Sequence, residues 1–156
     1  MAIASDLSVP SYAHRATFSF NAPITRPKGG QPIDTRRQND LHKLDVYRCA
    51  LQLYRKVSRI VAQFPRGEAD LRDQMKRAAR SVPFNIGEGV GKRGNARAAA
   101  YQVALGEDKE LIVALDCVEI DRLVPAADVI EAQDLADRVA AMLTKLIAAT
   151  RASGQS

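Results

Sequence analysis

The stretch KRAARSVPFNIGEG, from Lys76 to Gly89, decides how the rest of the chain can fold. It begins as a basic amphipathic helix, contains Pro83 in the middle of the pattern and runs out into glycines. A proline inside a helix lacks the amide that would bond the carbonyl four residues back, so a kink or a break is expected here. The small alanines and glycines would let a neighbouring helix approach closely. The stretch therefore predicts a tightly packed helix with an interruption at Pro83.

Apolar residues recur at intervals of three and four along most of the chain, and no segment shows sustained strand-like alternation. This spacing predicts helices at residues 40–63, 68–89, 95–123 and 125–151, followed by a tail at 152–156. The glycines from residue 87 to 94 are expected to end the second helix. In the third helix, Asp108, Glu119 and Arg122 are expected at polar positions. Four helices with short connections predict an all-α fold, an antiparallel up-down four-helix bundle.

Residues 1–39 differ from the rest, because they contain four of the seven prolines, the pair Gly29–Gly30 and no helical periodicity. They are expected to form a disordered or loosely docked N-terminal arm. Its aromatic residues could dock on a neighbouring surface, and its arginine pair could touch phosphate. These residues are Tyr12, Phe18, Phe20 and Arg36–Arg37.

The apolar runs are all shorter than the roughly 20 residues of a membrane span, and the N-terminus lacks the pattern of a secretory signal. Cys49 and Cys117 lie far apart in apolar helical patterns, so both are expected to be buried free thiols. A cytoplasmic protein without membrane contact is therefore expected.

Charge is unevenly distributed along the chain, whose net charge is +5. Residues 1–97 carry 18 Lys and Arg against 8 Asp and Glu, whereas residues 98–156 carry 5 against 10. The split is compatible with a basic face that binds nucleic acid. It is equally compatible with neutralisation between the two halves, within one subunit or between subunits.

Seven basic residues on the second helix and the loop after it are the candidate nucleic-acid contacts. They are Arg72, Lys76, Arg77, Arg80, Lys92, Arg93 and Arg97. Arginine presents forked donors that suit phosphate, so binding to RNA or DNA would be weakly sequence-specific and strongly salt-dependent. No aromatic residue is expected to be interleaved in this basic patch, and its absence argues against the stacking of bases on the protein. A solvated charged face is the alternative interpretation.

Catalytic and metal chemistry find little support in the sequence. GVGKRG, residues 89–94, matches GxGxxG, but phosphate binding by that pattern requires a preceding strand, and here a helix is predicted. His14 and His42 are isolated, so neither a metal nor a cofactor is expected. No nucleophile has an obvious base beside it. A non-enzymatic protein is therefore expected, and a nucleotide-using enzyme at the glycine loop is the weakest hypothesis.

The stretch that opens this section also resembles a known protein family. RAARSVPFNIGEG, residues 77–89, resembles the signature RRAA-x-S-[IV]-P-x-N-I-x-E-G of the four-helix-bundle proteins encoded in intervening sequences of 23S ribosomal RNA genes. YQVALG, residues 101–106, followed by Glu110 and Leu111, resembles that family's second conserved segment, although Glu107 replaces its usual serine. The structural motif within the signature comprises Ser81, Pro83, Asn85, Glu88 and Gly89. Asn85 and Glu88 would share a helix face and are expected to form a polar network at the interrupted helix.

This resemblance implies a homo-oligomer, with a ring of five subunits as the expected assembly. Relatives of the fold include the accessory protein of diversity-generating retroelements, so a basic surface that holds RNA, DNA or a reverse transcriptase is also implied. The leading hypothesis is a non-enzymatic, homopentameric nucleic-acid-binding protein. The alternative is a protein–protein scaffold without nucleic-acid contact, whose basic residues would pair with carboxylates such as Asp108 or Glu119.

Overall fold

The computed structural model describes residues 40–153, and all regular secondary structure in that range is helical. A short helix, α1 (Asp40–Lys43), precedes four long helices. These are α2 (Asp45–Val61), α3 (Ala69–Val90), α4 (Gly94–Ile120) and α5 (Ala126–Ser153). The predicted all-α class is confirmed. The proposed arm at 1–39, with its aromatic residues and arginine pair, lies outside the described residues.

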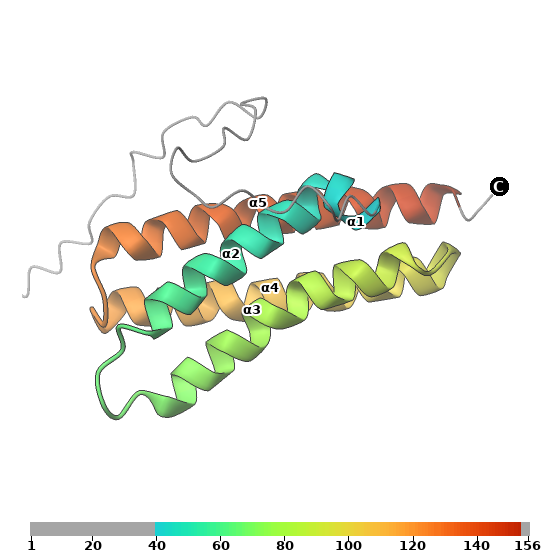
Figure 1. Ribbon diagram of the computed structural model, residues 1–156. Helices are drawn as coiled ribbons and strands as arrows, with labels where there is room; N and C mark the ends of the chain where they lie inside the picture. The colour runs from blue at the N-terminus through green and yellow to red at the C-terminus, as the bar shows by residue number, and fades with distance from the viewer. Residues whose placement is uncertain (1–39, 154–156) are drawn as a thin grey trace, which may run out of the picture. The chain divides into compact units, whose positions relative to one another are not determined.

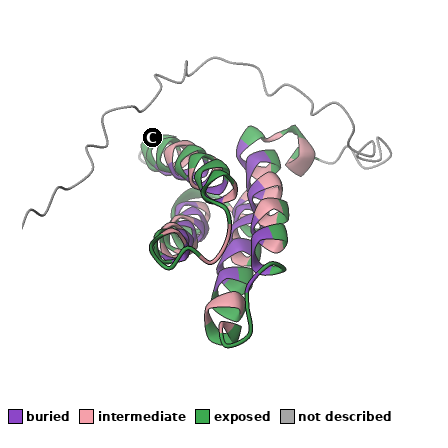
Figure 2. Cartoon of the chain, turned by 90° about the vertical axis from the view of Figure 1, so that its left-hand side faces the viewer, coloured by how far each residue is buried: buried purple, intermediate pink, exposed green. Residues whose placement is uncertain are grey.

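The four long helices form an antiparallel bundle with short connections (Figure 1). Helix α2 packs against α3 and α5, and α4 packs against the same two helices from the other side. The core lies between them, where the buried sides of the helices face one another (Figure 2). Every long helix therefore has an inner face in the core and an outer face directed away from it.

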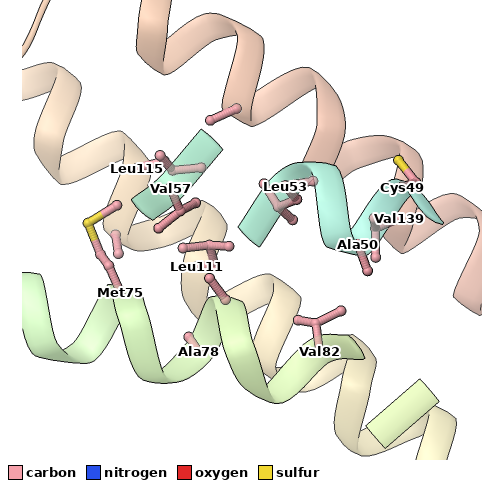
Figure 3. Close-up of a cluster of buried hydrophobic side chains, with 14 of the residues drawn as sticks. Cys49, Ala50, Leu53, Val57, Met75, Ala78, Val82, Leu111, Leu115 and Val139 are labelled. Carbon is pink, nitrogen blue, oxygen red and sulfur yellow. The ribbon is translucent and has the colours of Figure 1, made fainter. Parts of the chain in front are cut away.

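Aliphatic and small side chains fill the core, as the low aromatic content predicts (Figure 3). Leu53 and Val57 from α2 meet Met75 from α3 and Leu111 and Leu115 from α4, and all five are fully buried. Burying a side chain of this size contributes about 1.5–3 kcal/mol to folding. The apolar stripes that predicted the helices are thus the residues that hold them together.

One ion-pair cluster links α2 to α5 at the edge of this core. Lys56 Nζ donates to Asp128 Oδ1 at 2.7 Å and to Glu131 Oε2 at 2.6 Å. Partial burial would lower the pKa of Lys56, but these two hydrogen bonds outweigh it and raise the pKa overall. The hydrogen bond that Asp128 accepts from Lys56 lowers the pKa of Asp128. The cluster therefore favours the charged forms of Lys56 and Asp128 and links the two helices.

The expected interruption at Pro83 is wrong as a break, because α3 runs without interruption from Ala69 to Val90. Pro83 and its neighbours Val82 and Ile86 are buried in the core. Tertiary packing of this kind supplies most of the stability of a helix in a protein, and here it tolerates the missing backbone hydrogen bond. The break lies elsewhere, at Leu44, which separates α1 from α2 within the predicted helix 40–63.

The glycine-rich segment ends this helix close to the predicted residue 89, since α3 ends at Val90 and Gly91 is its C-cap, but Gly87 and Gly89 lie inside the helix. Gly89 has a packing role instead. A Cβ atom at this position would lie 2.3 Å from Cε1 of the Tyr101 ring, far inside contact distance. Tyr101 is a buried residue of α4. Glycine at position 89 therefore lets α3 and α4 approach closely enough for the tyrosine ring to pack between them.

Asp108 corrects another expectation, because it is fully buried rather than at a polar position of α4. Neither of its carboxylate oxygens has a hydrogen-bond partner among the described residues. Burial raises the pKa of Asp108 to about 7, opposed by the charge of Lys109 and reinforced by that of Asp137. Its position was available from the sequence, since it lies seven residues from both Tyr101 and Leu115 on the inner stripe.

The two cysteines differ from each other, and the expectation that both are buried is wrong for Cys117, which is exposed on α4. Cys49 is buried as expected, and burial raises its pKa to about 11. A thiol with such a pKa is an inert core residue. In the described part of the chain, no helix is long and apolar enough to cross a membrane.

Candidate nucleic-acid interface

Two of the seven candidate basic residues are arginines that stabilise the junctions between helices. Arg72, in the first turn of α3, donates from Nε to the Val61 carbonyl at 3.3 Å. Its Nη2 donates to the carbonyls of Phe64 and Pro65 at 3.3 and 3.4 Å. The last carbonyls of a helix have no partner within it. Arg72 therefore satisfies the end of α2 and the loop after it.

Arg97 repeats this arrangement one junction later, in the first turn of α4. Its Nε donates to the carbonyls of Lys92 and Gly89 at 2.7 and 3.2 Å, and its Nη2 donates to Val90 at 3.4 Å. These carbonyls belong to the end of α3 and the glycine loop. The guanidinium is thus engaged against the loop backbone, and the loop follows a helix rather than the strand that a dinucleotide site requires.

The outer face of α3 presents a different set of cations. Lys76, Arg77 and Arg80 are exposed, and within residues 40–153 neither Lys76 nor Arg80 forms an ion pair. Arg77 Nη2 lies 3.9 Å from Glu110 Oε1, and the arginine side chain is 72% exposed. An exposed pair at that distance contributes little. These three side chains are therefore available to an external anion.

Of the two basic residues in the loop after α3, one is neutralised by a carboxylate and the other is not. Lys92 Nζ lies 2.5 Å from Glu88 Oε1, so the glutamate of the signature neutralises it. Arg93 is exposed and makes no ion pair with any residue between 40 and 153. The structure thus brings Lys76, Arg77 and Arg80 together on one face of α3 and leaves Arg93 in the loop beyond the end of that helix.

The motif residues Ser81 and Asn85 bond to each other beside this face. Asn85 Nδ2 donates to the Ser81 carbonyl at 2.9 Å and to Ser81 Oγ at 3.0 Å. Glu88 takes no part in this pair, because it accepts a hydrogen bond from Lys92 instead, so the structure shows two local pairs rather than the expected network. The first pair holds one turn of α3 around Pro83, and Asn85 does not reach the Ala79 carbonyl, whose usual donor Pro83 lacks.

An aromatic residue stands among these cations, so the expectation of a patch without aromatics is wrong. Phe84 is 72% exposed on α3. It lines a shallow hollow together with Arg77, Arg80 and Ser81. A second hollow lies on the side of α2, and its lining comprises Leu41, Tyr47, Leu51, Tyr54, Arg80, Pro83, Phe84 and Gly87. Phe84 follows Arg80 by four residues, one helical turn, which could have placed the two on one face.

Arg55 and Arg59 on α2 were also missed, although they are four residues apart and both exposed. They contribute to a charge division between helix pairs. Helices α2 and α3 carry eight Lys and Arg against four Asp and Glu, a net charge of +4. Helices α4 and α5 carry five against nine, a net charge of −4. The basic half of the sequence therefore corresponds to one pair of neighbouring helices.

The scaffold hypothesis requires the basic residues to pair with carboxylates of α4, and the structure shows one long contact of this kind, between Arg77 and Glu110 at 3.9 Å. Asp108 is buried without a hydrogen-bond partner among the described residues, and Glu119 accepts a hydrogen bond from Gln133 at 3.1 Å rather than from a basic residue. Within residues 40–153, no group of three His, Cys, Asp or Glu side chains could hold a metal ion. The arrangement offers cations, an aromatic ring and shallow hollows.

Comparisons with known proteins agree with this fold. The fold is similar to a solved structure, that of a protein with unknown function from the S23 ribosomal protein family of Bacteroides thetaiotaomicron VPI-5482. It has a TM-score of 0.61 and 16% sequence identity, over 65% of this chain and 97% of that one. No curated protein matches the chain. The family model described as 23S rRNA-intervening sequence protein matches residues 42–145. The chain therefore belongs to the 23S rRNA-intervening sequence protein family.

Proposed function

We propose that the protein is a non-enzymatic homo-oligomer that binds nucleic acid through the outer face of α3. Lys76, Arg77 and Arg80 would supply the main phosphate contacts, and Arg93 a further one. One observation carries the proposal: three exposed cations lie together on one helix face with no strong carboxylate partner inside residues 40–153. Cations that a protein does not neutralise itself are the usual contacts of a phosphate backbone.

Three of the seven candidates play a smaller part in this proposal. Arg72 and Arg97 are half-buried and already donate to backbone carbonyls. Lys92 is paired with Glu88. Their charges still add to the field around the basic helices, but binding an anion directly would require them to give up these intramolecular bonds.

The test is the affinity for a labelled RNA oligonucleotide across a salt series, in the double variant Arg77→Glu and Arg80→Glu. We expect affinity to fall by more than about tenfold, and the slope of log affinity against log salt to decrease by about one for each phosphate that the variant no longer binds. The matched control is Arg138→Glu with Arg151→Glu, which changes the net charge equally on the exposed surface of α5. Equal reductions of affinity in both double variants would contradict a defined binding face.

Self-association has its own support, on the outer face of α4. Residues there recur at alternating intervals of three and four, and all but one are small or apolar. They are Ala96, Ala99, Val103, Gly106, Glu110, Val113, Cys117 and Ile120. Val113 is 62% and Ile120 78% exposed. A helix with apolar residues on both faces is expected to have a neighbour on both, and a second copy of the chain is the neighbour we propose.

The ring of five subunits implied by the family resemblance is the assembly that we expect. Light scattering of the purified protein measures its mass directly. Val113→Asp with Ile120→Asp should produce a smaller species, whereas the exposed Ala148→Asp on α5 serves as the control. A monomeric wild-type protein, or an unchanged mass in the double variant, would contradict self-association through α4.

A further inference from the structure

Phe84 is an aromatic side chain whose exposure the fold does not explain. Other apolar residues of the same helix, such as Met75, Val82 and Ile86, are fully buried. Phe84 is 72% exposed, on the side of α3 that carries the unneutralised cations. Its ring adds nothing to the core, so it belongs to an external surface.

The two hollows described above share a border. Arg80 and Phe84 line both of them, so these two side chains form the ridge that separates one hollow from the other. On one side of the ridge lie Arg77 and Ser81. On the other side lie two further aromatic residues of α2, Tyr47 and Tyr54. The surface formed by α2 and α3 thus presents the arginines first, then the ring of Phe84 and then the two tyrosine rings.

One of the residues that line the second hollow has no side chain. Gly87 lines it, and a Cβ atom there would lie 3.8 Å from both methyl groups of Leu41, an ordinary contact distance. Glycine is therefore not required at this position for packing. Its effect is to leave space beside Phe84 and the tyrosines.

We propose that this ridge and its hollows bind single-stranded nucleic acid, with unpaired bases stacking on Phe84 and in the tyrosine-lined hollow while Arg77 and Arg80 hold the flanking phosphates. The inference rests on the proposed function and narrows it to one class of nucleic acid. Proteins that bind single strands combine a positive surface with aromatic side chains, because every base has a face that can stack. The bases of a duplex are stacked on one another and would reach only the cations.

Substitution of Phe84 separates stacking from charge. The test compares anisotropy titrations of one labelled oligonucleotide, as a single strand and annealed to its complement. Phe84→Leu removes the aromatic face and keeps an apolar side chain, so we expect about 5- to 100-fold weaker binding of the single strand. Duplex affinity should change less than about twofold, and the salt slope should stay the same because every phosphate-binding cation is retained. Phe84→Tyr should restore binding.

Two controls keep the result interpretable. Phe84 is exposed, so Phe84→Leu should unfold at the wild-type temperature, which circular dichroism measures. Ile130→Ala shortens an exposed apolar residue on α5 and should leave both affinities unchanged. Gly87→Leu adds a side chain to the lining of the second hollow, and we expect this variant also to bind the single strand, but not the duplex, more weakly.

The outcomes distinguish this inference from the proposed function. If Phe84→Leu binds the single strand as wild type does while Arg77→Glu with Arg80→Glu does not, the stacking inference is overturned and phosphate binding stands. Wild-type protein that prefers the duplex would also overturn it. If wild-type protein binds neither probe at low salt, both proposals fall, as they would if this surface docks a protein.

Discussion

The two faces of α3 use the same short sequence in opposite ways. On the inner face, Met75, Val82 and Ile86 are fully buried, and Gly89 is so close to Tyr101 that no side chain fits. On the outer face, Arg77, Arg80 and Phe84 are exposed and lightly contacted. The family signature interleaves both sets. Its buried members specify the fold, and we propose that the exposed residues between them bind nucleic acid.

The arginines at the helix junctions resemble the inner face of α3 in that they stabilise the fold. Arg72 and Arg97 each lie in the first turn after a loop, where the carbonyls of the preceding helix lack partners. Arg77 and Arg80 lie in the middle of a helix, where no such carbonyls are near. We therefore expect changes on the inner face or at the junctions to alter stability, and changes on the outer face of α3 to alter binding.

The largest effect is expected inside the bundle, at Asp108. Its pKa is 3.8 in an unfolded chain and about 7 when folded, so the folded state retains a proton that the unfolded state loses. Stability should fall as pH rises between these values, by about 4 kcal/mol in total, and level off above pH 7. Asp108→Asn removes this titration and should be the more stable protein at pH 8, with little difference at pH 4. Urea unfolding at both pH values measures this, and parallel pH profiles would refute it.

A smaller effect is expected at Gly89, where the inner face meets Tyr101. Gly89→Ala forces the ring to move, and overpacking costs about 1–3 kcal/mol, which exceeds the roughly 1 kcal/mol that alanine contributes in a helix. Gly87→Ala is the matched control two residues away, because its added methyl group has room. Thermal unfolding should rank Gly87→Ala above wild type and Gly89→Ala below it. The opposite order would mean that α3 and α4 are not in close contact.

The junctions should show an effect of about 1–2 kcal/mol, since Arg97 donates three hydrogen bonds to the end of α3. Arg97→Lys keeps the charge and removes the forked donor. We expect it to unfold at lower urea concentration while binding RNA within about twofold of wild type. If the variant bound RNA more weakly at unchanged stability, Arg97 would have to be counted with Arg77 and Arg80 as a binding residue.

The outer face should show the smallest effect on stability. Arg80 forms no ion pair within residues 40–153, so Arg80→Ala should change the free energy of unfolding by less than about 0.5 kcal/mol. Denaturant unfolding of Arg80→Ala and of Arg97→Lys, measured together, compares the free energies of unfolding that an outer-face arginine and a junction arginine contribute. A clear destabilisation by Arg80→Ala would remove the distinction between them.

Much of the fold could be predicted from the sequence because apolar spacing reports the inner faces directly. Leu53, Met75 and Leu115 are in the core where the pattern indicates. Whether the helix predicted at 68–89 would kink or break at Pro83 could not be decided, because the outcome depends on packing around Val82 and Ile86. The polar assignment of Asp108 failed for a related reason: chemical type was given more weight than its place on the inner stripe.

The candidate interface was harder to predict than the fold. Sequence identifies seven basic residues but not the carbonyls or carboxylates that lie near each of them in space. Arg72 and Arg97 were grouped with Arg77 and Arg80 on residue type alone. Phe84 was passed over because it lies inside an apolar motif, and only its position opposite the core distinguishes it from Val82 and Ile86.

The salt dependence of RNA affinity tests the division between the two sets of arginines most directly. It would be measured for Arg77→Gln with Arg80→Gln and for Arg72→Lys with Arg97→Lys. We predict that the first pair lowers the slope of log affinity against log salt by about two, one for each arginine, at unchanged stability. The second pair should keep the slope and be less stable. A wild-type slope in the first pair, or no RNA binding by the wild-type protein at low salt, would contradict a binding role for the outer face of α3.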